Sequence, residues 1–201
     1  ILRSLFSSIF IFLYSVISII DFKLIFYLIL IIYLAVITEI YFNFSKYKTI
    51  PIIYICISFI FFNLIEFNKS TFNIFNLFIF IVITFDIFSY IFGKLFGHNK
   101  LIKISPNKTV EGFLGGFIFS LFLTLILTSY LSIKINAQII LIIFLIIMSA
   151  FLGDIIESFF KRKNNLKNSS ELIPGHGGVF DRFDSFLFSI ILYSISTTLL
   201  L

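Results

Sequence analysis

Seven long apolar runs, separated by short polar segments, decide what this chain can fold into. Each run is about 15 to 20 residues long, which is close to the length of helix that crosses a hydrocarbon core of roughly 30 Å. Backbone polar groups in hydrocarbon must find partners within their own segment, so we expect every run to be a helix. The predicted helices cover residues 5–20, 24–42, 51–65, 73–92, 112–131, 138–153 and 185–201.

The composition supports the same fold class. The chain has 201 residues, of which 60% are hydrophobic and 12% are charged. A soluble domain has about twice this share of charged residues, so too little polar surface is present to cover one. We therefore predict an all-α fold, a polytopic helical membrane protein with about seven transmembrane helices. Cys56 is the only cysteine, which excludes an intramolecular disulfide and a zinc cluster.

The basic residues are distributed unevenly between the two ends of the predicted helices. If the helices cross alternately, twelve of the fifteen Lys and Arg residues lie on the side of the N-terminus. Because positive residues gather on the cytoplasmic side, we expect the N-terminus and both long polar loops to be cytoplasmic. Attraction to anionic lipid head groups and binding of phosphorylated substrates are both open interpretations of this positive face. The run after Arg3 has no small-residue cleavage site, so we expect the first helix to be retained.

We expect two regions along the chain. Residues 1–72 are predicted to form N-terminal membrane helices. Residues 73–201 are predicted to form a second membrane region that carries the chemistry, with cytoplasmic loops at 93–111 and 154–184.

The longest polar stretch, residues 151–185, holds five of the ten acids of the chain. Asp154 and Glu157 are three residues apart at the end of the sixth run, and Asp181 and Asp184 have the same spacing at the start of the seventh. Two acid pairs at two helix ends can converge on one point, and Mg²⁺ typically takes one or two carboxylates together with water and substrate phosphate. Negative charge is favoured at a helix start and disfavoured at a helix end, so the helix dipole does not explain Asp154.

A glycine-rich run lies between the two acid pairs. It reads Pro174-Gly175-His176-Gly177-Gly178. Glycines let backbone N–H groups approach an anion closely, and His176 could donate to a phosphate. A plain flexible turn with an exposed histidine is the alternative, and it stays open.

The other long loop carries a second group of candidates. Asp86 falls inside the fourth predicted helix, where an ionisable residue indicates a functional site by default. Ser105, Lys108 and Thr109 are similar to a helix start with a lysine suited to phosphate, although the Walker A pattern is absent. Glu39 also interrupts an apolar run, and we interpret it as structural or peripheral.

These motifs together resemble the phosphatidate cytidylyltransferase family, also called CDP-diacylglycerol synthases. That family's C-terminal pattern reads Ser-x-x-Lys-Arg, four residues, Lys-Asp, then Pro-Gly-His-Gly-Gly, two residues and Asp-Arg-x-Asp. The chain matches it at Ser158, Lys161, Arg162, Lys167, Pro174, Gly175, His176, Gly177, Gly178, Asp181, Arg182 and Asp184. Upstream matches are Asp86, Tyr90, Gly93, Gly97, Ser105, Pro106, Lys108, Thr109, Glu111, Gly112, Gly153, Asp154 and Glu157. Asn168 stands where the family usually has Asp, and the resemblance covers roughly residues 80–190.

The resemblance implies a membrane enzyme that transfers CMP from CTP to phosphatidic acid, giving CDP-diacylglycerol and pyrophosphate. It implies Mg²⁺ held by Asp154 and Asp181, with a second, monovalent cation left open. The catalytic residues it implies are Asp154, Asp181, Lys167 and Asp184. The substrate-binding residues it implies are Lys161, Arg162, Ser105, Lys108, Thr109, His176, Gly177, Gly178, Arg182 and Asp86.

The implied partners are CTP, phosphatidic acid and membrane lipids, with no nucleic acid and with a homodimer left open. The implied location is the bacterial inner membrane, with the active-site loops in the cytoplasm.

Four other functions are alternatives to this one. A degenerate, non-catalytic member is motivated by Asn168. A small multi-span transporter should place polar residues at mid-membrane depth, whereas the acids here gather at helix ends, with Asp86 as the main exception. The long C-terminal pattern disfavours a lipid kinase, and a CDP-alcohol phosphatidyltransferase would need an Asp-Gly-x-x-Ala-Arg motif that the chain lacks.

Overall fold

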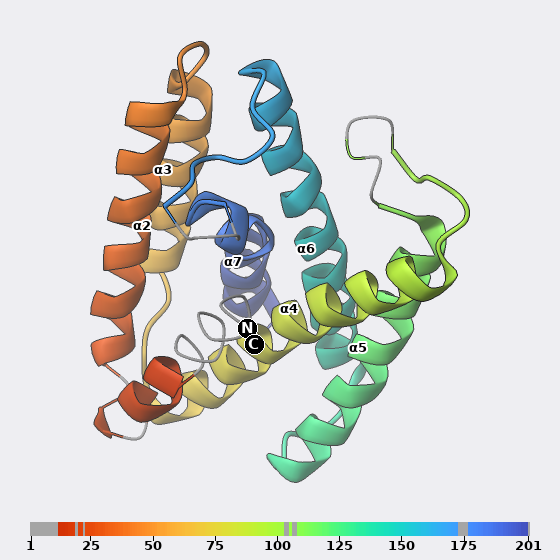
Figure 1. Ribbon diagram of the computed structural model, residues 1–201. Helices are drawn as coiled ribbons and strands as arrows, with labels where there is room; N and C mark the ends of the chain where they lie inside the picture. The colour runs from red at the N-terminus through yellow and green to blue at the C-terminus, as the bar shows by residue number, and fades with distance from the viewer. Residues whose placement is uncertain are drawn as a thin grey trace. The chain divides into compact units, whose positions relative to one another are not determined.

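The protein is described by a computed structural model that covers residues 12–18, 20–21, 23–102, 105, 108–172 and 177–200. Six named helices follow one another: α2 (Leu24–Asn43), α3 (Thr49–Asn63), α4 (Lys69–Phe96), α5 (Val110–Tyr130), α6 (Ala137–Lys163) and α7 (Phe180–Leu200) (Figure 1). Residues 12–18 are also helical. The described residues form no β-strand, so the predicted all-α fold is confirmed.

Four helices within the described ranges are long and apolar enough to cross a membrane. They cover Leu24–Asn43, Thr71–Phe96, Val110–Tyr130 and Ala137–Lys163. The helix α3 is apolar but has only 15 residues. The prediction of a helical membrane protein is therefore confirmed, and the count of seven crossings stays a prediction. Most of the first predicted helix, 5–20, lies outside the described residues.

Two helices are longer than their apolar runs. The helix α4 continues to Phe96, and α6 continues to Lys163, so residues 154–163 are helical instead of belonging to the predicted loop 154–184. The last turn of α6 holds Lys161, Arg162 and Lys163. Positive side chains there interact favourably with the negative end of the helix dipole, so the helix continues beyond its apolar part.

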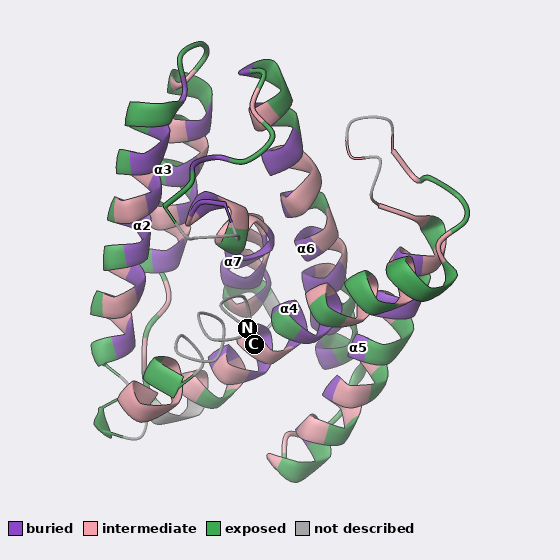
Figure 2. Cartoon of the chain, viewed as in Figure 1, coloured by how far each residue is buried: buried purple, intermediate pink, exposed green. Residues whose placement is uncertain are grey.

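The chain divides into two compact units, and the first comprises residues 1–59 and 160–183. Helix α2 buries one stripe of side chains at helical spacing, seen in purple along α2 in Figure 2. The members of this stripe are Ile25, Ile29, Ile32, Tyr33, Val36, Glu39 and Ile40. The hydroxyl groups of Tyr33 and Ser58 form a hydrogen bond of 2.6 Å, which joins α2 to α3. The rings of Phe44 and Phe180 meet edge to face, with centroids 6.2 Å apart.

The second unit comprises residues 60–159 and 184–201, and α4 crosses α5 in it at a set of small residues. A Cβ atom on Gly112 would lie 2.7 Å from the carbonyl oxygen of Ser89, and one on Gly116 would lie 2.9 Å from the Ser89 Cβ. Small residues at every fourth position continue the buried face of α5: Gly112, Gly116, Ser120, Thr124 and Thr128. Such residues let two membrane helices approach closely and gain dispersion contacts.

Aromatic pairs join the remaining helices of the second unit. The rings of Phe78 on α4 and Tyr193 on α7 have centroids 4.6 Å apart, and those of Phe113 on α5 and Phe151 on α6 are equally close at 4.6 Å. Ring pairs at this separation stabilise a core beyond their buried area. These two ring pairs therefore join α4 to α7 and α5 to α6.

Replacing Gly116 with leucine is expected to lower the unfolding temperature in detergent. The new side chain would meet Ser89 and Phe85 at the helix crossing, and overpacking of this kind costs about 1–3 kcal/mol. For a chain of this size, that corresponds to a decrease of roughly 2–12 °C. The control is Leu114→Ala on the exposed side of the same helix, where the temperature should change little. An unchanged unfolding temperature for the Gly116 variant would contradict the close crossing.

Candidate functional site

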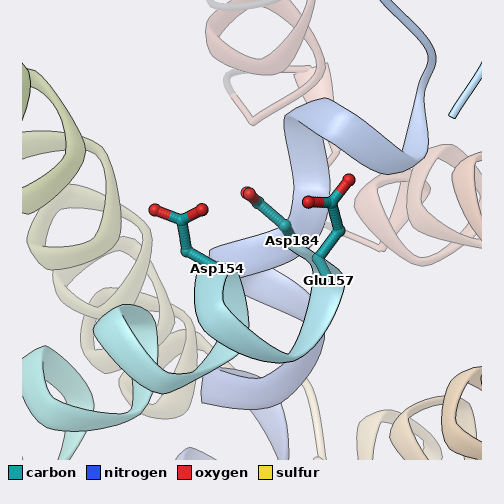
Figure 3. Close-up of side chains that lie close together, drawn as sticks. All are labelled: Asp154, Glu157 and Asp184. Carbon is teal, nitrogen blue, oxygen red and sulfur yellow. The ribbon is translucent and has the colours of Figure 1, made fainter. Parts of the chain in front are cut away.

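Three carboxylates meet in the second unit. Asp154 and Glu157 come from α6 and Asp184 comes from α7, and one oxygen of each lies within 4.8 Å of the others. Figure 3 shows the three side chains next to one another on the adjoining turns of these two helices. Glu157 is buried, and Asp154 and Asp184 are half-buried. We call these three residues the acidic cluster.

A glycine next to the cluster lets the two helices approach. A Cβ atom on Gly153 would lie 2.6 Å from the carbonyl oxygen of Asp184 and 3.2 Å from the Cα of Ser185. The backbones of α6 and α7 therefore touch at this level, one residue before Asp154. Because residues three apart share one face of a helix, Glu157 follows Asp154 onto the side that faces Asp184.

The acidic cluster concentrates negative charge in a partly buried place. Burial, followed by the negative charges of Asp154 and Glu157, raises the pKa of Asp184 well above its usual value. Carboxylates that share a site disfavour each other's ionised form. A cation held among the three oxygens would remove this cost.

Lys108 is the positive group that the structure brings to the acidic cluster. Its ammonium group forms an ion pair with Asp154, and its side chain is only 16% exposed. The same group lies 5.5 Å from the centroid of the Phe151 ring. Because Lys108 is largely buried, its charge interacts more strongly with Asp154 than it would in water.

Two neighbours of Lys108 that were predicted to bind substrate have local structural contacts. The hydroxyl group of Thr109 accepts the N–H of Gly112 at 3.1 Å and so caps the start of α5. The carbonyl oxygen of Ser105 accepts the N–H of Lys108 at 3.0 Å. These contacts fix the backbone on either side of Lys108.

Asp86 is tied to the start of α7. The hydroxyl group of Ser185 donates to Asp86 at 2.9 Å, and the Ser185 N–H donates to the side chain of Asp184 at 2.8 Å. Asp86 therefore lies beside the acidic cluster, one hydrogen-bonded residue away from Asp184. Its functional role as an acid inside an apolar helix stays a prediction.

Asp181 holds a different part of the chain, in the first unit. Its Oδ1 accepts from the ammonium group of Lys161 at 2.6 Å. Its Oδ2 accepts from the N–H of Ser169 at 2.9 Å, from the Ser169 hydroxyl at 2.8 Å and from the Gly178 N–H at 2.8 Å. These bonds join the end of α6, the segment after it and the first turn of α7.

The two described glycines of the predicted glycine-rich run leave room for carboxylates. Gly177 has φ 81°, in the left-handed region, and a Cβ atom there would collide with the Asp181 carboxylate. A Cβ atom on Gly178 would collide with Glu39 and with Ser169. The Gly178 N–H donates to Asp181 within the protein. His176 lies outside the described residues.

Glu39, which we interpreted from the sequence as structural or peripheral, is bonded to the start of α7, a contact that the sequence did not predict. It is 2% exposed, and its Oε2 accepts the N–H groups of Val179 at 2.7 Å and Phe180 at 3.1 Å.

The predicted phosphate contacts are mostly at the surface. Arg162, Lys167 and Arg182 are exposed, and Arg162 also donates to the carbonyl oxygen of Leu166 at 2.9 Å. Lys161 is half-buried and pairs with Asp181. All four belong to the first unit, like Asp181, whereas Asp154 belongs to the second. The predicted metal pair of Asp154 with Asp181 therefore stays a prediction, and the structure adds Glu157 and Asp184 as neighbours of Asp154.

Replacing Gly153 with valine is expected to weaken divalent cation binding at least about tenfold. The side chain would push the α6 backbone away from Asp184 and Ser185, and small displacements at a metal site are costly. Binding of Mn²⁺ to the purified protein, followed by electron paramagnetic resonance, measures this change. The control is Leu152→Val, at the exposed residue next to Gly153, which should bind Mn²⁺ with the affinity of the unaltered protein. Equal Mn²⁺ affinity for all three proteins would show that the contact of α6 with α7 at Gly153 does not determine the geometry of the acidic cluster.

Known proteins show similarity over much of this chain. The model of the cytidylyltransferase family matches residues 1–200. A protein named phosphatidate cytidylyltransferase from Staphylococcus aureus (strain COL) is 42% identical over 113 residues, which is 55% of this chain and 43% of that protein. Proteins of the same name from Staphylococcus saprophyticus and Staphylococcus haemolyticus are 43% and 42% identical over 113 residues. The matched segment thus spans less than half the length of these relatives, at 43% in each case.

Proposed function

The chain belongs to the cytidylyltransferase family, and on this premise we propose that it transfers the cytidylyl group of CTP to phosphatidic acid. The products would be CDP-diacylglycerol and pyrophosphate. The observation that carries the proposal is the acidic cluster with its paired Lys108, at the polar ends of apolar helices. Relatives that are named phosphatidate cytidylyltransferase support the choice of substrates.

The proposed reaction is a displacement at phosphorus. An oxygen of the phosphatidate phosphate forms a bond to the α-phosphorus of CTP, and the bond from that phosphorus to the bridging oxygen breaks. Pyrophosphate leaves with the electron pair of the broken bond. A phosphate monoester is already anionic near neutral pH, since its second pKa is about 6, so no side chain has to remove a proton.

The residues present suit a divalent cation. Three carboxylates offer hard oxygen ligands with one oxygen of each within 4.8 Å of the others, which is the donor type that Mg²⁺ prefers. We assign Asp154, Glu157 and Asp184 to hold it, and Asp181 stays a further predicted ligand. When bound, Mg²⁺ would neutralise triphosphate charge and stabilise the negative charge that develops on the phosphoryl oxygens.

The chain's own bases would hold the phosphates. Lys108 presents a compact positive charge at the cluster, which suits a phosphate as a point charge. Lys161, Arg162, Lys167 and Arg182 extend the basic surface of the first unit, where arginine can bind phosphate through two N–H groups at once. The remaining predicted substrate contacts, Ser105, Thr109, His176, Gly177, Gly178 and Asp86, stay proposals.

One substrate is a lipid and the other is soluble in water, so the reaction needs a site at the membrane surface. The acidic cluster lies near the polar end of α6, which is a candidate membrane span. The uneven distribution of Lys and Arg favours a cytoplasmic face for the site and a location in the bacterial inner membrane.

The purified protein is expected to convert CTP and phosphatidic acid into CDP-diacylglycerol and pyrophosphate in a reaction that a chelator stops. Asp154→Asn, Glu157→Gln and Asp184→Asn should each lower the rate at least about 100-fold, because each removes a charged ligand oxygen. Asp21→Asn, at an exposed acid outside the cluster, is the control and should keep the full rate. Both products are measured in mixed micelles with matched amounts of folded protein.

Each other outcome points elsewhere. Full turnover by the cluster variants or in the presence of chelator would refute the metal assignment. Binding of CTP without turnover would indicate a degenerate member of the family. Neither binding nor turnover would favour a non-enzymatic role in the membrane.

A further inference from the structure

The carboxylate of Glu39 on α2 is bonded to the start of α7. Its Oε2 accepts the N–H of Val179 at 2.7 Å and the N–H of Phe180 at 3.1 Å. The two segments are separated by 140 positions in the sequence, and Glu39 is 2% exposed. A buried acid in an apolar helix is costly, so these contacts are a specific feature that offsets the cost.

The start of α7 needs such a partner. The first N–H groups of a helix have no acceptor within the helix, and a serine, threonine, aspartate or asparagine usually supplies one. Val179, the residue before α7, has an apolar side chain and cannot do so. Glu39 supplies the acceptor from another helix, and its negative charge lies at the positive end of the helix dipole.

A second carboxylate, that of Asp181, binds the same segment. The Gly178 N–H donates to Asp181 at 2.8 Å, so the three successive N–H groups of residues 178–180 are all bound by Glu39 or Asp181. Gly178 leaves no spare room, because a Cβ atom there would collide with the Glu39 carboxylate. The two acids therefore hold the backbone of residues 178–180 by three hydrogen bonds.

We infer that Glu39 is a positioning residue for the substrate-binding segment 177–182. By fixing Val179 and Phe180, it sets the places of Asp181 and Arg182, which the proposed function assigns to metal or phosphate binding. The expected effect of Glu39 on CTP binding rests on that proposed function, whereas the contact of Glu39 with the segment does not. Glu39 would act through the segment and would touch no reacting atom.

The experiment compares Glu39→Ala with Glu39→Gln, in the full chain in detergent. Alanine removes both hydrogen bonds, whereas glutamine keeps an oxygen that can accept them. Glu66→Ala and Glu66→Gln make the same two changes at an exposed glutamate and serve as controls. Hydrogen exchange of the peptide that contains residues 177–182 reports the contact, and the KM for CTP and kcat report its effect.

Three results are expected together. Exchange in the segment becomes at least about tenfold faster in Glu39→Ala and changes little in Glu39→Gln, because hydrogen bonds to charged or strongly polar acceptors hold the N–H groups closed. The KM for CTP rises about tenfold in Glu39→Ala, with kcat within about threefold, because binding and not chemistry is affected. Glutamine restores the KM.

Several results would overturn the inference. One is unchanged exchange in Glu39→Ala. Another is a fall in kcat in proportion to the folded fraction of Glu39→Ala, with an unchanged KM. A residue that only stabilises the fold would give this result. If Glu39→Ala does not fold, Gly178→Ala tests the same contact, since its Cβ displaces the Glu39 carboxylate, and a normal KM with normal exchange would refute the positioning role. If the unaltered protein has no turnover, the proposed function fails, whereas exchange and the Kd for CTP still decide the role of Glu39.

Discussion

The contact between the α6 and α7 backbones at Gly153 is the constraint on which the acidic cluster depends. A Cβ atom there would lie 2.6 Å from the carbonyl oxygen of Asp184, so any larger residue needs the helices to separate. Asp154 and Glu157 face Asp184 only because the helices cross at this level. The close approach of the two helices thus forces the three acids to lie near one another, at an electrostatic cost. Because Gly153 has no side chain, no rotamer change can move the helices apart and lower this cost.

Carboxylates have two different roles in this protein. Those of the acidic cluster lie close to one another and suit a cation. Those of Glu39 and Asp181 accept backbone N–H groups and hold the segment that leads into α7. The distinction is visible in the partners: like charges surround Asp184, whereas N–H groups and Lys161 surround Asp181.

The sequence predicted the helices from local rules, and it suggested that the acid pairs Asp154/Glu157 and Asp181/Asp184 can converge on one point. Of these four acids the structure brings together Asp154, Glu157 and Asp184, whereas Asp181 binds other partners. Long apolar runs indicate helices, and the spacing of three residues places two acids on one face. The predicted run 24–42 agrees with α2 at Leu24–Asn43. The end of α6 at Lys163 could not be predicted from hydrophobicity, because its last turns are polar and are stabilised by charge at the helix end.

The contact of Glu39 could not be predicted for a different reason. It joins residues 140 positions apart, and no spacing rule within α2 indicates an acceptor for the start of α7. The hydroxyl group of Thr109 caps the start of α5, and its predicted contact with phosphate stays a proposal, because a helix start suits both an anion and a capping hydroxyl. The tertiary structure is needed to show which backbone N–H groups Glu39 binds.

The occupied N–H groups of residues 178–180 have a consequence for how this protein discriminates among anions. A loop that offers several backbone N–H groups binds an anion through fixed dipoles, which salt weakens little. Here the N–H groups of residues 178–180 already point at Glu39 and Asp181, and exposed side chains such as Arg162 and Lys167 are groups of the first unit that we propose attract the nucleotide. Attraction by exposed charges is screened over about 8 Å at physiological ionic strength. The proposed attraction of the nucleotide to these side chains should therefore weaken as the salt concentration rises, whereas charge interactions within the partly buried acidic cluster should change less.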